Sequence, residues 1–414
     1  MYKVKVAIIT VGELPVPTIK GGGAETLIEQ VLDENEKSKV YEFVVYSIEN
    51  EQAKEKSNKY NHAQFVFLKK EKKSILKRLK RKAIYLCTGF HLPLENFSYK
   101  KIINDIENRN VDYVLIENTM VPFPEYVKHF GNKVLLHTHW DYINNNLPKV
   151  VLKKYKKAAL NCGGIITVSE YIKRRILTVP EIKDEKVSVL KNCTDIEKFN
   201  ISLSEEDRNS IRGDYGIHKD DIVFIFTGRI SKEKGVIELA QAFSNASVTN
   251  SNIKLLIVGS AQTGNDIVDE YSQKVYDILE PLNEKVIFTG YVNHDDMPKI
   301  YKVADVALLP STGQDPAPLT IFEAMASGLP IITTYSGGIP EYASKECAVV
   351  VSIDDQIVSS LKNAIIELAT NVSKRALMKQ ESKKRASLFT TRQYYEDFTK
   401  IISKKDKNEN SNKN

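Results

Sequence analysis

Short apolar runs alternate with amphipathic segments along almost the whole chain. In the first half, the apolar runs have the length of buried strands and are separated by stretches with helical spacing. After the glycines at 21–23, the residues Leu27, Ile28, Val31 and Leu32 fall on one face of a helix. Strands are therefore expected at 4–9, 43–46, 65–68, 113–116, 134–137, 164–168 and 187–190.

The second half repeats this pattern more regularly. Its apolar runs do not alternate with polar residues, which is typical of parallel strands covered by helices on both faces. The pattern predicts strands at 222–226, 253–258, 286–288, 306–309, 331–333 and 348–351, and helices near 235–246, 266–280, 318–327 and 356–370. Alternating strands and helices form doubly wound sheets, so each half is expected to be a Rossmann-like α/β domain.

Polar and turn-forming residues mark the borders of these domains. Asn192 to Asp195 form a turn sequence, and 202–208 is polar. We therefore expect an N-terminal domain at 1–195 and a C-terminal domain at 196–370. A helical segment at 371–403 is expected to pack back toward the N-terminal domain, and a disordered tail at 404–414 to follow.

Composition is that of an ordinary globular protein, and charge is concentrated in one place. The net charge is +6, yet residues 69–82 hold nine Lys or Arg and one Glu, a local +8, so the remainder carries −2. A nucleic-acid-binding protein more often has a basic face across a domain. The four cysteines form no CxxC pair, and no apolar run reaches about 18 residues. These features predict a cytosolic chain with buried thiols, no structural zinc and no membrane span.

The segment 315–328 carries the strongest chemical signal. Pro318 suits the first position of a helix and Gly328 the position just after its end. The first turn, at Leu319 and Thr320, offers unpaired backbone N–H groups to an anion. Asp315 and Glu323 flank this place, and carboxylates beside a phosphate site are better suited to bind hydroxyl groups. A diphosphate with hydroxyls on both sides is a nucleotide sugar.

Two loops add groups suited to phosphate. Arg229 and Lys234 follow an apolar strand, where two cations can neutralise a leaving diphosphate. The glycines 21–23 precede a helix and allow close backbone approach to a ligand, although they form neither a GxGxxG fingerprint nor a P-loop. Each loop alone is compatible with a purely structural role.

Together these motifs resemble the retaining glycosyltransferases of family 4, which have the GT-B fold. Asp315 and Glu323 match the ends of the family's E-x7-E motif, and Arg229 and Lys234 match its G-R-x-x-x-x-K-G segment. Three further segments match in the same order along the chain: Gly22, Gly23 and Glu25; Asn192 to Asp195 with Phe199; and Ser336 to Glu341. The resemblance implies two Rossmann-like domains that face a central cleft.

The resemblance also implies roles for single residues. Arg229, Lys234 and the amides of Leu319 and Thr320 would hold the donor diphosphate. Glu323 would bind the ribose and Asp315 the transferred sugar. Gly22 and Gly23 would close over the phosphates, and His139 resembles the family's active-site histidine, with His137 as the rival for that position.

Some positions depart from the family pattern. The first motif carboxylate is Asp315 instead of Glu, and Pro318 replaces the usual glycine at the helix start. The chain also lacks an Asp-x-Asp pair of the kind that holds a divalent metal in GT-A enzymes. We therefore expect no metal and no cofactor besides the nucleotide sugar. The retained stereochemistry of the family that the chain resembles implies that the departing phosphate is the base for the acceptor hydroxyl.

The basic segment has an apolar stripe with helical spacing. This is typical of a helix that lies on an anionic membrane surface, although a solvated, packed helix and an anionic-polymer site are alternatives. Its candidate contacts are Lys73, Leu76, Lys77, Arg78, Lys80 and Arg81.

The sequence thus predicts a cytoplasmic enzyme, peripheral on the inner face of the plasma membrane. It would transfer a hexose from a nucleotide sugar, with UDP-sugar favoured, to a polysaccharide or lipid-linked glycan. The alternatives are a nucleotide-sugar epimerase of GT-B fold and a non-catalytic GT-B partner subunit of a transferase. No nucleic-acid partner is expected.

Overall fold

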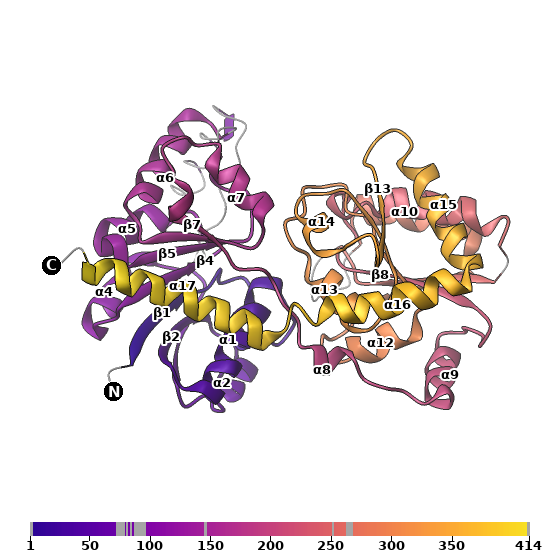
Figure 1. The fold of residues 1–414 in the computed structure, drawn as a ribbon, viewed down its shortest axis with the longest axis horizontal. Coiled ribbons are helices and arrows are strands. Elements are labelled where there is room, and N and C mark those ends of the chain that lie inside the picture. The colour runs from indigo at the N-terminus through magenta and orange to yellow at the C-terminus, as the bar shows by residue number, and fades with distance from the viewer. Residues whose placement is uncertain are drawn as a thin grey trace. The chain divides into compact units, whose positions relative to one another are not determined.

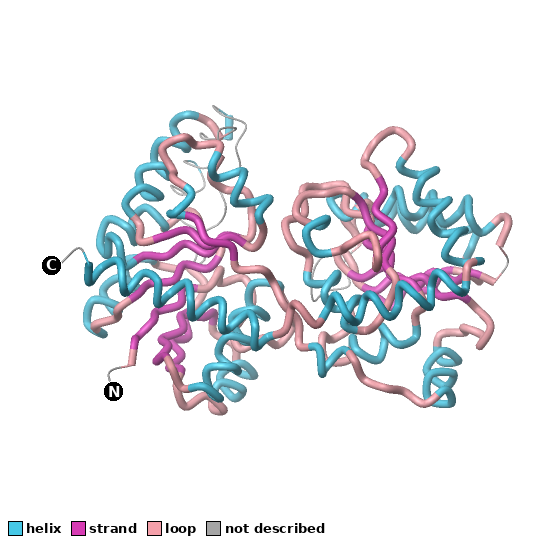
Figure 2. Tube along the Cα trace, in the orientation of Figure 1, coloured by secondary structure: helices cyan, strands magenta, loops and turns pink. Residues whose placement is uncertain are grey.

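The fold was analysed in a computed structural model that describes residues 3–71, 79, 82, 85–86, 97–144, 147–250, 252–261 and 268–411. The chain forms two compact units (Figures 1 and 2). Unit 1 comprises Met1–Lys191 and Tyr394–Asn414, and unit 2 comprises Asn192–Gln393. The unit border therefore falls at the turn sequence that begins with Asn192, and the C-terminal helical segment is divided between the two units.

Unit 1 contains a parallel sheet with strand order β3-β2-β1-β4-β5-β6-β7. Neighbouring strands pair in parallel throughout, as Val6 does with Phe43 on one side and Tyr113 on the other. The strands are β1 (Val4–Ile9), β2 (Tyr41–Ile48), β3 (Ala63–Leu68), β4 (Tyr113–Glu117), β5 (Val134–Thr138), β6 (Gly164–Thr167) and β7 (Val187–Val189).

Helices connect these strands and cover the sheet (Figure 2). The last of them, α17, returns to unit 1, where Tyr395 donates a hydrogen bond to Asn35 (2.8 Å) and Phe398 packs against Tyr41 and Phe43. The helices are α1 (Gly23–Ser38), α2 (Glu51–Ser57), α4 (Tyr99–Arg109), α5 (Phe123–Phe130), η1 (Gly131–Lys133), α6 (Lys149–Asn161), α7 (Glu170–Leu177), η2 (Asp184–Lys186) and α17 (Thr391–Ser411).

Unit 2 repeats the same architecture with strand order β10-β9-β8-β11-β12-β13, again with parallel pairs. Its strands are β8 (Ile222–Thr227), β9 (Ile253–Val258), β10 (Val286–Gly290), β11 (Val306–Leu309), β12 (Ile331–Thr334) and β13 (Ala348–Val351). Its helices are α8 (Ile196–Phe199), α9 (Glu205–Asp214), η3 (Lys232–Lys234), α10 (Val236–Ser247), α11 (Glu270–Leu279), η4 (Glu280–Leu282), α12 (Met297–Val303), α13 (Leu319–Ala326), α14 (Ile339–Tyr342), α15 (Ile357–Thr370) and α16 (Val372–Ala386).

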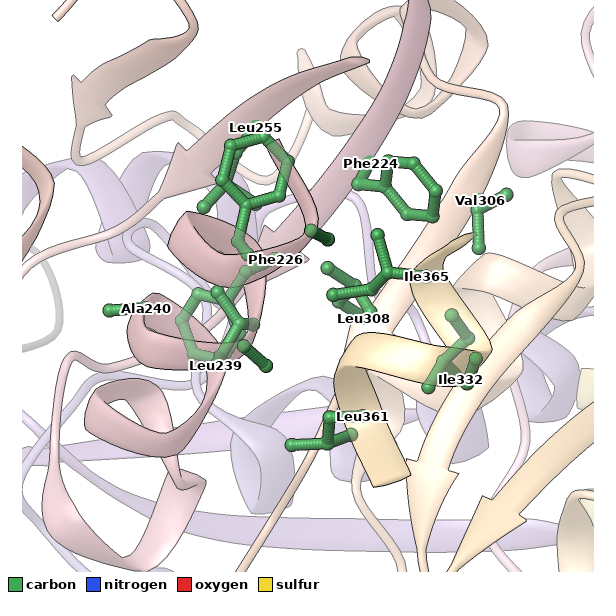
Figure 3. Packing of buried hydrophobic residues seen from close by; sticks show 14 of the residues in the cluster. Phe224, Phe226, Leu239, Ala240, Leu255, Val306, Leu308, Ile332, Leu361 and Ile365 are labelled. Atoms are coloured by element: carbon green, nitrogen blue, oxygen red, sulfur yellow. The ribbon is translucent and has the colours of Figure 1, made fainter. Parts of the chain in front are cut away.

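A continuous apolar core lies between the unit 2 sheet and the helices on one of its faces. Phe224 and Phe226 point from β8 toward Leu239 of α10 and Ile365 of α15, and all four are essentially inaccessible to solvent (Figure 3). Each large side chain buried in this way contributes roughly 1.5–3 kcal/mol to folding. The non-alternating apolar runs are thus explained by burial on both faces of the sheet.

The predicted fold class is confirmed, and a strand forms at every predicted position. The differences lie at element ends. α13 begins at Leu319, because the backbone of Pro318 is extended (φ −67°, ψ 129°), so Pro318 precedes the helix instead of opening it. α17 continues through Ser411, so most of the segment 404–414 is helical instead of disordered. Lys and Glu in that segment are good helix formers, so a polar composition does not by itself exclude a helix there.

Each sheet has one place where the chain reverses its direction of travel across the strands. In unit 1 this switch point lies between β1 and β4, and in unit 2 it lies between β8 and β11. Loops diverge at the carboxyl ends of such strand pairs, and ligands of doubly wound proteins bind in the resulting crevice. The loops after β8 and β11 carry Arg229, Lys234 and Asp315.

Candidate functional site

In unit 2, opposite charges meet at the switch point. Lys234 lies in η3 after β8, and its Nζ contacts Oδ2 of Asp315, which follows β11, at 2.5 Å. Arg229 is exposed on the same loop as Lys234 and has no hydrogen-bond or ion-pair partner among the described residues. This loop therefore carries both predicted cations, of which Lys234 is paired with Asp315 and Arg229 is exposed to solvent.

The backbone around Asp315 is fixed by the segment after β12. The N–H of Asp315 donates to Oγ of Ser336 (3.2 Å), and the N–H of Gly338 donates to the carbonyl of Asp315 (2.9 Å). Asn192 donates to the carbonyl of Ala317 (2.9 Å). Two of the other sequence motifs, Asn192 to Asp195 and Ser336 to Glu341, thus act as supports for the loop that carries Asp315.

Glu323 lies on α13 and is 6% exposed. Its two oxygens contact Nε2 of His294 (3.0 Å) and the hydroxyl of Tyr301 (3.0 Å). Burial and the neighbouring Glu323 charge raise the pKa of Tyr301 well above its usual range, so this hydroxyl stays a donor. Phe199 packs edge-on against both His294 and Tyr301. Glu323 is therefore held in one orientation, with room for a further hydrogen bond only at its remaining lone pairs.

The start of α13 is an open anion-binding end. No side chain caps the helix, and Leu319 and Thr320 are partly exposed. The amides of the first helical residues have no partner within the helix and lie at the positive end of its dipole. At the other end, Gly328 has φ +78°, and the N–H groups of Gly328 and Leu329 donate to Met325 and Ala324. The expected role of Gly328 after the helix end is confirmed.

In unit 1, the glycine loop precedes α1. Gly22 has φ +115°, and a Cβ there would lie 2.5 Å from an oxygen of Glu25 and 2.8 Å from Leu14, so only glycine fits. Gly23 is the first residue of the helix. Burial raises the pKa of Glu25 to about 7, helped by the charges of Glu13 and Glu117. A carboxyl group with a pKa near neutral pH thus lies beside the loop that is predicted to approach the donor phosphates.

A buried carboxylate binds two histidines at the ends of β4 and β5. Glu117 contacts Nδ1 of His137 at 3.0 Å and Nε2 of His139 at 3.3 Å, and the two rings are 4.5 Å apart. Burial would raise the pKa of Glu117, but the hydrogen bonds and charges of the histidines hold it at about 2. The His137 side chain is 2% exposed and that of His139 is 11% exposed, so His139 is the more accessible of the two rivals.

The contacts with Glu117 define where the protons reside. An ionised carboxylate only accepts, so His137 carries a proton on Nδ1 and His139 on Nε2. Burial and nearby His137 lower the pKa of His139, which favours a neutral ring whose Nδ1 can accept a hydrogen bond. Within the described residues, this group is also a set of three side chains whose ligand atoms lie within 4.8 Å of one another, a spacing compatible with a metal ion.

The remaining predicted positions are less informative. Lys73, Leu76, Lys77, Arg78, Lys80 and Arg81 lie outside the described residues, as does Cys87. Cys162, Cys193 and Cys347 are buried, as predicted. No helix within the described ranges has the length and apolarity needed to cross a bilayer.

Three side chains that contact the predicted site residues could not be predicted from motifs. Glu117 is the last residue of an apolar strand, and this place beside the switch point is the one feature of the sequence that could have indicated it. His294 and Tyr301 lie far from any motif, and their pairing with Glu323 depends on how α12 packs beside α13.

Comparison with known proteins gives these sites a context. Residues 207–385 match the family described as glycosyl transferases group 1. An uncharacterized glycosyltransferase of Methanocaldococcus jannaschii is 32% identical over 182 residues, which cover 44% of this chain and 45% of that protein. A capsular polysaccharide biosynthesis glycosyltransferase of Staphylococcus aureus is 30% identical over 244 residues, which cover 57% and 60%. The aligned regions thus span less than two thirds of either relative.

The fold of the whole chain also has a solved counterpart. A protein of Anabaena, crystallised with UDP and glucose, superposes with a TM-score of 0.74 at 17% identity and covers 97% of this chain and 100% of that one. At this identity the likeness shows the fold alone. Residues 207–385 are thus similar to the group 1 glycosyl transferases, and the fold of the chain is similar to that of the Anabaena protein.

Proposed function

We propose that this protein is a retaining, metal-independent glycosyltransferase of family 4. It transfers a hexose from a UDP-sugar to a polysaccharide or lipid-linked glycan. The observation that carries the proposal is the unit 2 switch point. There Arg229, Lys234 and the open end of α13 offer positive charge, and Asp315 and Glu323 offer hydrogen-bond acceptors.

Charge balance supports a nucleotide diphosphate as the ligand. Arg229 is free to bind phosphate, and Lys234 can exchange Asp315 for phosphate oxygens without loss of a charged partner. The carboxylate of Asp315 then becomes available to a sugar hydroxyl. Glu323, fixed by His294 and Tyr301, accepts from the ribose. The Anabaena protein that shares the fold was crystallised with UDP, which favours uracil as the base.

The same groups support the proposed metal independence. Two cations and a helix dipole supply the positive charge that a divalent ion would bring to the leaving diphosphate. The departing phosphate then accepts the proton of the acceptor hydroxyl, and no protein nucleophile is needed. We assign Gly22 and Gly23 to the phosphates, and His139 to the donor sugar.

The proposed acceptor rests on sequence similarity to a relative. The Staphylococcus relative is named for capsular polysaccharide biosynthesis, so we propose a surface glycan or its lipid-linked precursor as acceptor. Residues 69–82 would place the enzyme at the cytoplasmic face of the membrane through their Lys and Arg side chains.

Thermal melting with UDP-, GDP- and ADP-sugars in EDTA tests the donor. A ligand at about 100 times its dissociation constant adds about 2.7 kcal/mol to folding, which moves the midpoint of a large chain by roughly 5–10 °C. We expect this shift with one UDP-sugar, unchanged when Mg²⁺ is added, and then transfer of its hexose to an acceptor extract.

Three results would contradict the proposal. A shift that requires a divalent ion would remove metal independence. The absence of a shift with all three nucleotide classes, with or without Mg²⁺, would favour a non-catalytic partner subunit. Turnover of the donor without any acceptor would instead indicate an epimerase.

A further inference from the structure

A cavity of about 460 Å³ lies at the amino ends of β11 and β12 in unit 2. This is the end of the sheet opposite to the loops of the proposed donor site. Its walls come from α9, α12, α16 and the turn that follows α13. A helix of eight residues spans about 12 Å, so α13 separates this cavity from the anion-binding end at Leu319.

The walls carry positive charge that no acid neutralises. Lys302, Lys379 and Lys383 all line the cavity. Within the described ranges Lys379 and Lys383 have no ion-pair or hydrogen-bond partner, and Lys302 donates to the carbonyl of Ser327 (2.9 Å). The acidic wall residue, Asp305, is already bound to Arg208 and to Arg212.

The three ammonium groups are close enough to influence one another. Burial, together with the charges of Lys383 and Lys379, lowers the pKa of Lys302 to about 8. The stem of Lys383 lies directly over Gly328, where an added Cβ would be 2.7 Å from its Cε. Lys383 is thereby held beside Ser327 at the end of α13.

Ser327 supplies an independent sign of a ligand. It is 2% exposed and lines the cavity, yet its Oγ has no hydrogen-bond partner among the described residues. A buried hydroxyl without a hydrogen-bond partner destabilises the unliganded protein. Such a donor beside three unneutralised ammonium groups is suited to an anionic oxygen.

We propose that this cavity binds a soluble phosphate monoester with a sugar-sized body. Lys302, Lys379 and Lys383 contact the phosphate oxygens, and the Ser327 hydroxyl donates a hydrogen bond to one of them. The volume is within the range of about 300–1,000 Å³ that is typical of small-molecule sites and exceeds what a phosphate ion alone would fill. This site is separate from the proposed donor site and does not depend on sugar transfer.

Calorimetric titration of the full chain with a hexose 6-phosphate tests this site, with inorganic phosphate and the unphosphorylated hexose as comparison ligands. We expect the hexose phosphate to bind more tightly than phosphate, and the plain hexose not to bind. Vesicles that contain an anionic phospholipid form a further arm, because lipid headgroups share the same phosphate chemistry. Binding to the vesicles alone would overturn the proposal in favour of a membrane-facing surface.

Variants locate the binding. Each charged hydrogen bond contributes about 1.5–3 kcal/mol, so the double variant Lys379→Ala/Lys383→Ala should lose at least tenfold in affinity. Lys384→Ala is the matched control, because Lys384 lies on the same helix, is exposed and pairs with Glu381 instead of lining the cavity. Its affinity should be unchanged.

Ser327→Ala separates binding from folding. Its hydroxyl has no partner to lose, so the unliganded protein should melt at the same or a higher temperature. The affinity for the hexose phosphate should fall by roughly two- to tenfold. Equal losses of affinity in Lys384→Ala and in the double variant would show that the binding depends only on general surface charge. Loss in Lys234→Ala alone would place the ligand in the donor site, and either result overturns the proposal.

Discussion

The two units share one strand order around the switch point but place opposite chemistry there. In unit 2, the loops after β8 and β11 carry the exposed Arg229, the Lys234–Asp315 pair and the start of α13, which no described side chain caps. In unit 1, the equivalent edge is buried and rich in carboxyl groups, with Glu25 beside the glycine loop and Glu117 beneath two histidines. The same fold therefore carries different groups at its two switch points, because the loops that supply those groups differ.

The two carboxyl groups of unit 1 also differ from each other. Among the described residues Glu25 has no cationic partner, and burial raises its pKa to about 7, whereas the histidines hold the pKa of Glu117 at about 2. Burial acts in the same direction on both groups, so the neighbours decide the outcome. The following substitutions test these contrasts, beginning with the largest expected effect.

Lys234→Ala should reduce transfer by about 10²–10³-fold, because it removes a cation from the leaving diphosphate. Steady-state transfer and nucleotide binding measure the loss. Lys232→Ala, an exposed lysine of the same loop, is the control and should retain activity. Comparable loss in both variants would show that general charge, and not the position of Lys234, supports the reaction.

Glu25→Gln should stabilise the protein at pH 8 and leave it unchanged near pH 4. The folded-state pKa of Glu25 is raised from 4.5 to about 7, so wild-type stability falls as pH rises through this interval. The full difference is up to about 3 kcal/mol above pH 7. Thermal midpoints measured from pH 4 to pH 8 should diverge with rising pH. Parallel curves would show that Glu25 is ionised in the folded protein without cost.

Glu117→Gln should lower transfer at least about tenfold while nucleotide affinity stays the same. The Gln side chain can place an N–H₂ donor opposite a histidine N–H donor. The hydrogen bond that keeps the proton on Nε2 of His139 is then lost. Glu107→Gln is the matched control, since Glu107 contacts the exposed His129. If nucleotide affinity fell together with transfer, Glu117 would not act on transfer alone, and this prediction would be wrong.

Tyr301→Phe should have the smallest effect. It removes one hydrogen bond to Glu323 and one to Thr227, at a cost of about 1–3 kcal/mol in folding stability. Nucleotide affinity should fall only several-fold, because His294 still contacts Glu323. Denaturant unfolding and titration with the nucleotide check both values. Unchanged affinity would show that the orientation of Glu323 does not limit binding.

The sequence predicted the elements much better than their contacts. Apolar runs located a strand at every predicted position, since a strand buried on both faces needs such a run whatever surrounds it. Predicted helix ends differ from the observed ones where a residue type suits two positions. Pro318 is an example, because proline can precede a helix as readily as it can be its first residue. The motifs located Arg229, Lys234, Asp315 and Glu323 on the loops and the helix of one unit.

Side-chain partners depended on residues far away in the chain. Lys234 and Asp315 are 81 residues apart and meet only because β8 and β11 are neighbours at the switch point. The partners of Glu323, the proton arrangement of His139 and the basic cavity behind α13 likewise arise from helices packed side by side.

The sequence by itself determined the order of strands and helices and the kinds of charged and polar groups on the loops between them. The tertiary structure decided which of those groups are free, which are paired and which are buried. Hydrophobic periodicity is a local property that each segment carries alone. Charge pairing and desolvation, by contrast, depend on distances between atoms that only the packed chain brings together.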